Sequence, residues 1–223
     1  MPDGQYSFYL HSDDRTDIAA MATISTISQP LRGEFIRTAA TAGAVVFQVD
    51  ARLPALIPVF FAGQLSAVRL CAVMALVSGT WSSLTGLPDE PENGEAALPV
   101  SPETEYQRRR YTLTLQNGRS GERVESVLTE ASSRLRGDLL RNLIITGLAL
   151  HTTAPELPRL LASMPVPPTS VSELQALVQQ MAGTAGVSRA AAAVPDTPAT
   201  SAVPVSGSDT REIKKNMRRA FGD

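Results

Sequence analysis

The sequence has little of the residue types that build disulfides, metal sites and most catalytic centres. It contains a single cysteine, Cys71, and two histidines, His11 and His151. One cysteine cannot form a disulfide framework or a cysteine-based zinc site, and two histidines leave little for histidine-based catalysis. The common nucleotide-binding, metalloprotease and serine-hydrolase motifs are also absent. The sequence therefore predicts a protein that is not an enzyme and that needs no metal and no cofactor.

Long uninterrupted apolar runs are missing as well. The most apolar stretch, residues 51–77, is interrupted by Pro54 and Pro58 and contains Arg69. It therefore offers no clean span of about twenty apolar residues for a bilayer. Residues 1–10 are polar and charged, unlike a secretory signal. We expect a cytoplasmic bacterial protein with no membrane partner, and a buried core or dimer-interface helix in the apolar stretch.

Positive charge is scarce in the first half of the chain. Residues 1–95 contain five arginines and ten acidic residues, whereas residues 96–223 contain fifteen basic and twelve acidic residues. The net charges of the two parts are −5 and +3, although the whole chain carries only −2. A polyanion such as DNA is therefore expected to meet the second half.

The most informative feature that is present is an internal repeat. Residues 31–37 (LRGEFIR) align with residues 135–141 (LRGDLLR), and the same offset of 104 places Gly43 on Gly147 and residues 53–54 on 157–158. Upstream, the strands of the two copies match if one residue is inserted in the first copy. Each copy is predicted to contain a strand, two helices, a short helix that starts with proline, and a final helix. Self-similarity at a fixed offset predicts a duplication.

The strand of the second copy carries the candidate binding surface. From Tyr111 onward apolar and polar side chains alternate, which predicts a half-buried strand, and helices are expected over about 122–132 and 137–152. A strand with two helices is too small to fold alone, so it needs a partner strand from a second chain or from the first copy. Its outward face suits the major groove, which admits a two-stranded ribbon. A solvated edge that resists aggregation is the alternative.

The remaining composition divides the chain into segments. We expect a diverged first copy over 1–86, a linker over 87–105, a ribbon-helix-helix copy over 106–182, a disordered tether over 183–208 and a partner-binding motif over 209–223. A capping box that ends at Glu173 is expected to begin the last helix of the second copy. The first strand has no permanent cation at its outward positions, so the first copy is expected to serve as a scaffold or for dimerisation. These outward positions are Gln5, Ser7, Tyr9 and His11.

The C-terminal segment predicts a short helix that docks on a partner. Ile213, Met217 and Phe221 recur at four-residue steps and form one apolar stripe. Basic residues flank this stripe: Lys214, Lys215, Arg218 and Arg219. A helix of about fifteen residues is marginal in isolation, so it would fold on docking. A basic tail that only adds non-specific DNA affinity is the alternative.

The second copy and the tail resemble the ParR/StbB-type adaptors of plasmid partition systems that use an actin-like ATPase. Three segments carry the resemblance: RRRYTLTLQ at 108–116, ITGLALHTTAPELPRLLASM at 145–164 and EIKKNM at 212–217. The resemblance implies a ribbon-helix-helix protein that binds centromere-like plasmid repeats in double-stranded DNA, represses its own operon and captures an actin-like ATPase filament through its tail. The motor would be another protein, because no ATPase motif is present.

The resemblance also assigns residues by position. The implied DNA-contacting residues are Arg108, Arg109, Arg110, Thr112, Thr114 and Gln116 on the strand, with Arg136 and Gly137 beside a phosphate. The implied partner-binding residues are Ile213, Lys214, Lys215, Met217, Arg218 and Phe221.

The extra N-terminal copy departs from the family pattern, in which two chains build the ribbon. Two arrangements stay open, an internal pseudo-dimer and a homo-oligomer in which second copies pair between chains. The expected fold is mainly α, with one short strand per copy, duplicated ribbon-helix-helix units, helical extensions and a disordered C-terminal tail. A transcriptional repressor or antitoxin of the same fold, and a structural oligomerisation protein without DNA binding, are the alternative functions.

Overall fold

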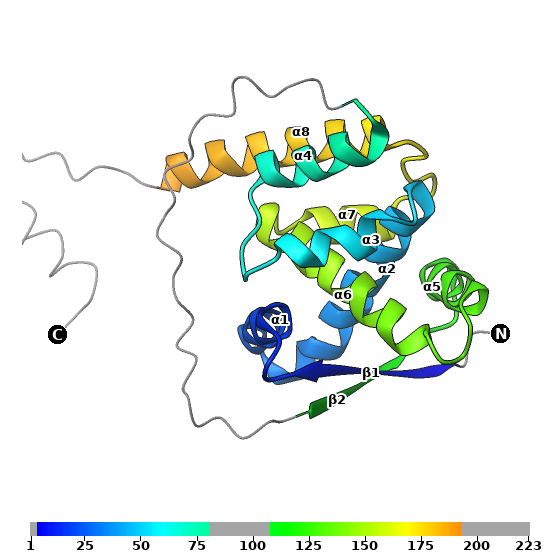
Figure 1. Cartoon of the computed structure of the whole chain (residues 1–223). Helices are drawn as coiled ribbons and strands as arrows, with labels where there is room; N and C mark the ends of the chain where they lie inside the picture. The colour runs from blue at the N-terminus through cyan, green and yellow to red at the C-terminus, as the bar shows by residue number, and fades with distance from the viewer. Residues whose placement is uncertain (1–3, 81–107, 193–223) are drawn as a thin grey trace, which may run out of the picture. The chain divides into compact units, whose positions relative to one another are not determined.

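The computed structural model describes residues 4–80 and 108–192, and their side chains as far as residue 183. The elements of the first copy are β1 (Gln5–His11), α1 (Arg15–Ser25), the 3-10 turn η1 (Gln29–Leu31), α2 (Arg32–Val49), α3 (Leu53–Leu56), the 3-10 turn η2 (Ile57–Phe60) and α4 (Ala67–Ser78). Those of the second copy are β2 (Arg108–Thr114), α5 (Arg119–Glu130), α6 (Arg136–Thr153), α7 (Leu157–Ser163) and α8 (Val171–Ala192). The predicted element order and the mainly helical fold are confirmed (Figure 1).

The two strands pair with each other inside the chain. β1 and β2 form a two-stranded antiparallel sheet in which Gln5 lies opposite Thr114 and His11 opposite Arg108. Figure 1 shows this ribbon along one side of the helices. The ribbon is therefore an internal pseudo-dimer in which each copy supplies the partner strand that the other needs.

The inner face of the ribbon closes the apolar core. Phe8 and Leu10 of β1 and Leu113 of β2 are buried, and the rings of Phe8 and Tyr111 stack with centroids 5.2 Å apart. Opposed residues in a sheet point to the same face, so this apolar face fixes the other face of both strands toward solvent. A register slip of one residue would turn every buried side chain outward, which is why the register is well specified.

The helices α2 and α6 cross at two glycines that are equivalent in the repeat. A methyl group on Gly43 would overlap the backbone of Leu143, and one on Gly147 would overlap the backbone of Ala39. The offset of 104 converts each of these contacts into the other, which is the reciprocal pattern of a two-fold interface. Only glycine allows two helix backbones to approach this closely. The two copies are therefore related by an approximate two-fold axis through this crossing.

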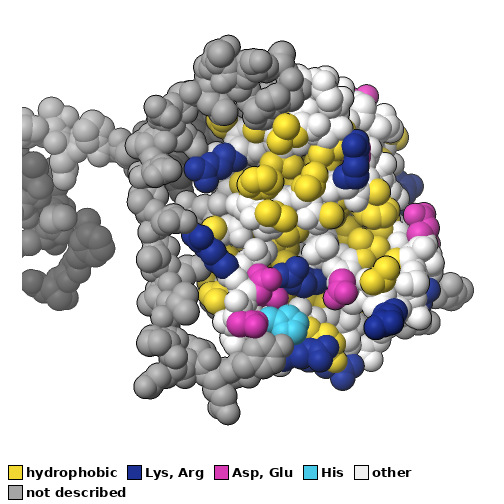
Figure 2. All heavy atoms as spheres, viewed as in Figure 1, with side chains coloured by type: hydrophobic (Ala, Val, Ile, Leu, Met, Phe, Trp, Pro, Cys, Tyr) yellow, Lys and Arg dark blue, Asp and Glu magenta, His cyan; other side chains and the backbone are white. Residues whose placement is uncertain are grey.

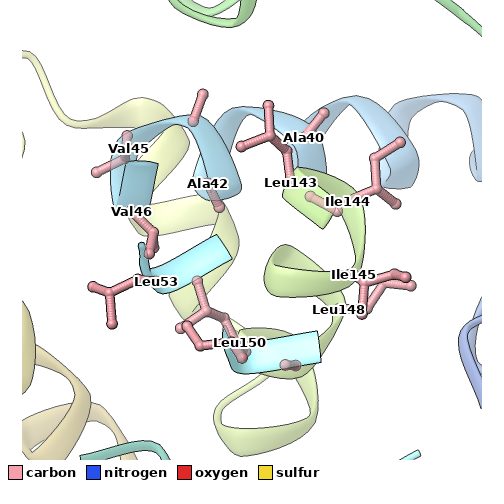
Figure 3. Packing of buried hydrophobic residues seen from close by; sticks show 14 of the residues in the cluster. Ala40, Ala42, Val45, Val46, Leu53, Leu143, Ile144, Ile145, Leu148 and Leu150 are labelled. Carbon is pink, nitrogen blue, oxygen red and sulfur yellow. The ribbon is translucent and has the colours of Figure 1, made fainter. Parts of the chain in front are cut away.

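Aliphatic side chains fill the space around the crossing. Figure 3 shows Val45 and Val46 of α2 and Leu143 and Leu148 of α6 gathered in one cluster with Leu53 of α3. All five are fully buried. The two central helices of the copies therefore share one core, and both copies belong to the compact unit of residues 1–188.

Polar contacts repeat the same two-fold relation. Arg32 donates from Nε to the carbonyl oxygen of Ile27 at 2.8 Å, and Arg136 donates from Nε to that of Ala131 at 3.2 Å. Each arginine thus binds a carbonyl that its preceding helix leaves unpaired. In the same way, Thr16 donates to the carbonyl of Pro58, and its equivalent Ser120 donates to that of Ala162.

The final helix of each copy packs against the core. In α4 five residues are buried, among them Leu70 and Met74, as expected for the apolar stretch. The capping box of α8 is present, because Glu173 accepts from the backbone of Thr169 at 2.8 Å and Ser170 accepts from the backbone of Glu173 at 3.2 Å. None of the helices within 4–80 and 108–192 combines the length and apolar character that a bilayer span requires. The helix α8 extends to Ala192 and overlaps the beginning of the predicted tether.

Candidate nucleic-acid interface

The outer face of the ribbon is built from four opposed pairs of residues. Its pairs are Gln5 with Thr114, Ser7 with Thr112, Tyr9 with Arg110 and His11 with Arg108. The side chains from β2 are all exposed, whereas Ser7, Tyr9 and His11 of β1 are half-buried. Figure 2 shows basic side chains and a histidine at the lower edge of the view, where Figure 1 places the ribbon. The structure therefore brings the predicted outward residues of both strands onto one surface.

The two outward arginines are held across the ribbon by residues of the first copy. Arg110 donates to the hydroxyl of Ser7 from Nε at 3.2 Å and from Nη2 at 2.9 Å. The guanidinium of Arg108 lies 3.6 Å from the centroid of the Tyr9 ring. A cation over an aromatic face is attracted by the ring electrons. Each arginine is therefore oriented on the surface and keeps further donors free, because a guanidinium has five.

The remaining strand residues take different positions. Arg109 lies opposite Leu10, on the side that bears the apolar face, and its guanidinium is 5.3 Å from the Tyr111 ring centroid. It is exposed, so it lies at the margin of the ribbon. Gln116 is also exposed and lies just beyond the end of β2. Arg109 is therefore separated from Arg108 and Arg110 by the pleat of the strand.

The start of α6 lies beside the strand of the other copy. A methyl group on Gly137 would be 3.4 Å from the carbonyl oxygen of Ser7 in β1. Arg136, however, directs its Nε to the carbonyl oxygens of Leu128 and Ala131. Its guanidinium therefore serves the end of α5, a structural role that the sequence did not indicate.

An ion pair joins the copies next to the ribbon. Asp17 at the start of α1 is completely buried and accepts from Nε of Arg141 in α6 at 2.7 Å and from the backbone N–H of His11 at 2.9 Å. Burial raises the pKa of Asp17, and the hydrogen bond from Arg141 opposes this rise. Nη2 of Arg141 also lies 3.2 Å from Asp14. This network fixes α1 against the second copy.

The predicted partner-binding motif lies outside the described residues. This applies to Ile213, Lys214, Lys215, Met217, Arg218 and Phe221, and to the tether over 193–208. Within the described ranges, no group of three or more histidine, cysteine, aspartate or glutamate side chains is placed to hold a metal ion.

The fold and the ribbon define the class of the protein. Two strand-helix-helix units pair their strands inside one chain and expose the other face, which is an internal ribbon-helix-helix pseudo-dimer. The model of a family described as plasmid stability protein matches residues 4–74 and 109–178. The chain therefore belongs to the plasmid stability protein family, and the two matches agree with the duplication. No curated protein and no solved structure matches the chain.

Proposed function

We propose that the chain is a plasmid segregation adaptor of the ParR/StbB type, which binds DNA through the outer face of its ribbon. Membership of the plasmid stability family supports a role in plasmid maintenance. The observation that carries the DNA-binding proposal is the exposed row of Arg108, Arg110, Thr112 and Thr114 on one ribbon face.

The chemistry of this row supports contact with base edges and phosphates. Arginine donates two parallel hydrogen bonds to guanine, and threonine hydroxyls donate or accept at several bases. A two-stranded ribbon fits the width of the major groove. Arg110 is already oriented by Ser7, so less side-chain freedom is lost when it binds.

Internal pairing gives the proposed recognition surface a direction. The cations come from β2, whereas β1 contributes Gln5, Ser7, Tyr9 and His11. A dimer of identical chains would instead present the same residues twice and favour a palindromic site. One molecule of this chain would therefore read a non-palindromic repeat in a single orientation, and successive molecules would bind tandem repeats with the same polarity.

The second half of the proposal concerns the tail. The apolar stripe of Ile213, Met217 and Phe221 with its basic flanks is suited to docking on an actin-like ATPase filament. Homo-oligomers of the chain on tandem repeats would present several tails at once and raise the effective concentration for a filament end.

Replacing Arg110 and Thr112 together by alanine tests the ribbon. The double variant should bind duplex DNA carrying the plasmid's repeats at least about tenfold more weakly, because a bidentate base contact contributes about 1–3 kcal/mol. Arg69→Ala is the control, since Arg69 is an exposed arginine on α4, away from the ribbon. Gel-shift affinity measures both. If the double variant retains the affinity of the control and both fold normally, the ribbon is not the DNA-binding surface.

A further inference from the structure

The two-fold axis relates two flanking sites that have opposite charge. Each site lies where a strand leads into the first helix of its copy and where the second helix of the other copy passes. The hydrogen bond from Thr16 to the carbonyl of Pro58, and that from Ser120 to the carbonyl of Ala162, show that the first helix of each copy is placed alike beside the equivalent segment of its own copy. The side chains at the two sites differ.

The flanking site of the first copy is filled by carboxylates of the chain itself. Asp14 caps α1 by accepting from the backbone N–H of Asp17 at 3.0 Å. Arg141 binds both of these carboxylates, at 2.6 Å from Asp17 and 3.2 Å from Asp14. A helix N-terminus and an arginine from the other copy therefore form an anion-binding arrangement, and in this copy the anion is internal.

The flanking site of the second copy has the corresponding helix start and arginine, but no carboxylate at the two positions equivalent to Asp14 and Asp17. At the offset of 104, Gly118 and Gly121 stand in place of Asp14 and Asp17, and Asn117 stands in place of Asp13. Arg37 of α2 is the equivalent of Arg141, and it pairs with the exposed Glu34 at 2.6 Å. An open pocket of about 360 Å³ lies here.

Positive groups from three elements line this pocket. They are Arg37 of α2, Arg119 of α5 and Arg159 of α7, against one acidic residue, Glu34. Arg159 stands where the first copy has Ala55, so this cation is added only on this side. The first turn of α5 also borders the pocket, and no side chain caps it. Unpaired backbone N–H groups and a helix dipole favour an anion at such a terminus.

The position in α5 that is equivalent to Asp17 has no room for a carboxylate. A methyl group on Gly121 would overlap the carbonyl oxygen of Gln116. The turn before α5 lacks the residue that is inserted in the first copy, and it therefore closes onto the helix. Any residue larger than glycine at position 121 would push this turn away. Position 121 therefore carries no internal anion of the kind that Asp17 supplies in the first copy.

We infer that the pocket formed by Arg37, Arg119, Arg159 and the first turn of α5 binds a phosphate group. Phosphate suits it better than a single carboxylate, because arginines from three directions match the several oxygens of a tetrahedral anion. The phosphate is either one of the DNA backbone beside the ribbon or free phosphate in solution. The DNA-backbone form rests on the proposed function, whereas the free-phosphate form does not.

Calorimetric titration of the full chain with inorganic phosphate tests the pocket. Replacing Arg119 and Arg159 together by alanine should weaken phosphate binding by about tenfold or more, because each removes charge-assisted hydrogen bonds. Arg69→Ala should bind phosphate as the unchanged protein does, since Arg69 is an exposed cation on another helix. Asn117→Asp is a second variant that places a carboxylate in the pocket lining, at the position equivalent to Asp13, without changing side-chain size, and it should also weaken binding.

The salt dependence of binding to a mixed-sequence DNA duplex identifies the source of the phosphate. If the DNA backbone occupies the pocket, the double variant should lower the slope of log affinity against log salt by about one or more. An unchanged slope with weakened binding of inorganic phosphate assigns the pocket to free phosphate. If the unchanged protein binds inorganic phosphate but no DNA, and the variants lose phosphate binding, the proposed function is refuted and the pocket is supported. The inference is overturned if the double variant and Asn117→Asp match Arg69→Ala in both measurements.

Discussion

Replacing Gly147 by alanine is expected to destabilise the protein although it improves helix propensity. The new methyl group would overlap the backbone of Ala39 in α2, and a backbone cannot rotate away as a side chain can. Overpacking of this kind costs about 3 kcal/mol, in the upper part of the usual range. The exchange of glycine for alanine inside a helix returns about 1 kcal/mol. The free energy of unfolding should therefore fall by about 2 kcal/mol.

Two further glycines make this prediction specific. Gly43→Ala meets the backbone of Leu143 at the equivalent point and should cost about the same. Gly33→Ala is the control in the same helix as Gly43, because its methyl group would lie 3.9 Å from Nη1 of Arg37, an ordinary contact. It should leave stability unchanged or raise it by up to about 1 kcal/mol.

Urea unfolding and thermal unfolding, both followed by circular dichroism, measure all three variants. A fall of about 2 kcal/mol in a chain of this size should lower the melting temperature by about 4–8 °C. The two-fold crossing of α2 and α6 is refuted if Gly147→Ala and Gly43→Ala are as stable as Gly33→Ala.

Three other changes probe the ion pair, the core and the tail. Arg141→Ala should lower the free energy of unfolding by about 3 kcal/mol, because it leaves Asp17 buried without its charged partner. Arg37→Ala is the control, since it removes only a surface ion pair and should cost about 1 kcal/mol or less. Equal losses of the two variants in denaturant unfolding would contradict this. Burial raises the pKa of Asp17 above 3.8, so the folded state holds this proton more tightly and stability falls as pH rises from 3.8 through the folded value. Arg141→Ala removes a group that lowers this pKa, so it should enlarge that fall above pH 3.8, and an unchanged pH profile would count against it. Thr146→Val should raise stability by about 1 kcal/mol, since the Thr146 hydroxyl is buried with no hydrogen-bond partner; a loss in thermal unfolding would show that the hydroxyl is needed. Deletion of residues 209–223 should abolish co-pelleting with the actin-like filament and leave DNA affinity nearly unchanged, and co-pelleting of the shortened protein would refute the docking motif.

The sequence predicts most of the architecture because the repeat and the residue periods are local signals. Alternation from Tyr111 identified the strand and its outward residues, and the offset of 104 identified the matching elements. Element boundaries were less well predicted. The helix α5 begins at Arg119 and not near residue 122. Gly118, with a φ of 136°, ends the turn that follows β2, and the helix starts at the next residue. A helix start without a capping side chain leaves little signal in the sequence.

Which strands pair could not be read from the sequence. Pairing within the chain and pairing between chains bury the same apolar face, so both satisfy the same pattern of residues. The position of Arg136 illustrates a related difficulty. The resemblance implies a phosphate contact for Arg136 and gives no indication that nearby carbonyls bind its guanidinium. Such contacts depend on how the helix ends lie in space.

The opposite charge of the two flanking sites was missed, although the sequence contains the signal. Aligned at the offset of 104, Asp14 and Asp17 face Gly118 and Gly121, and Ala55 faces Arg159. Agreement between the copies predicts the scaffold, and their differences in charge indicate the pocket. Only the structure places Arg37 and Arg159 at the same α5 terminus.

The central claim is that one chain supplies both strands of a DNA-binding ribbon, and the salt dependence of its affinity for the plasmid's repeats tests it most directly. Fluorescence anisotropy of a labelled repeat duplex, titrated with the full chain at several salt concentrations, gives both the affinity and the number of chains bound. We expect one chain per repeat and an affinity that falls steeply with salt, as release of counterions from phosphates requires. Binding that needs two chains per repeat, or an affinity that does not change with salt, would contradict the claim.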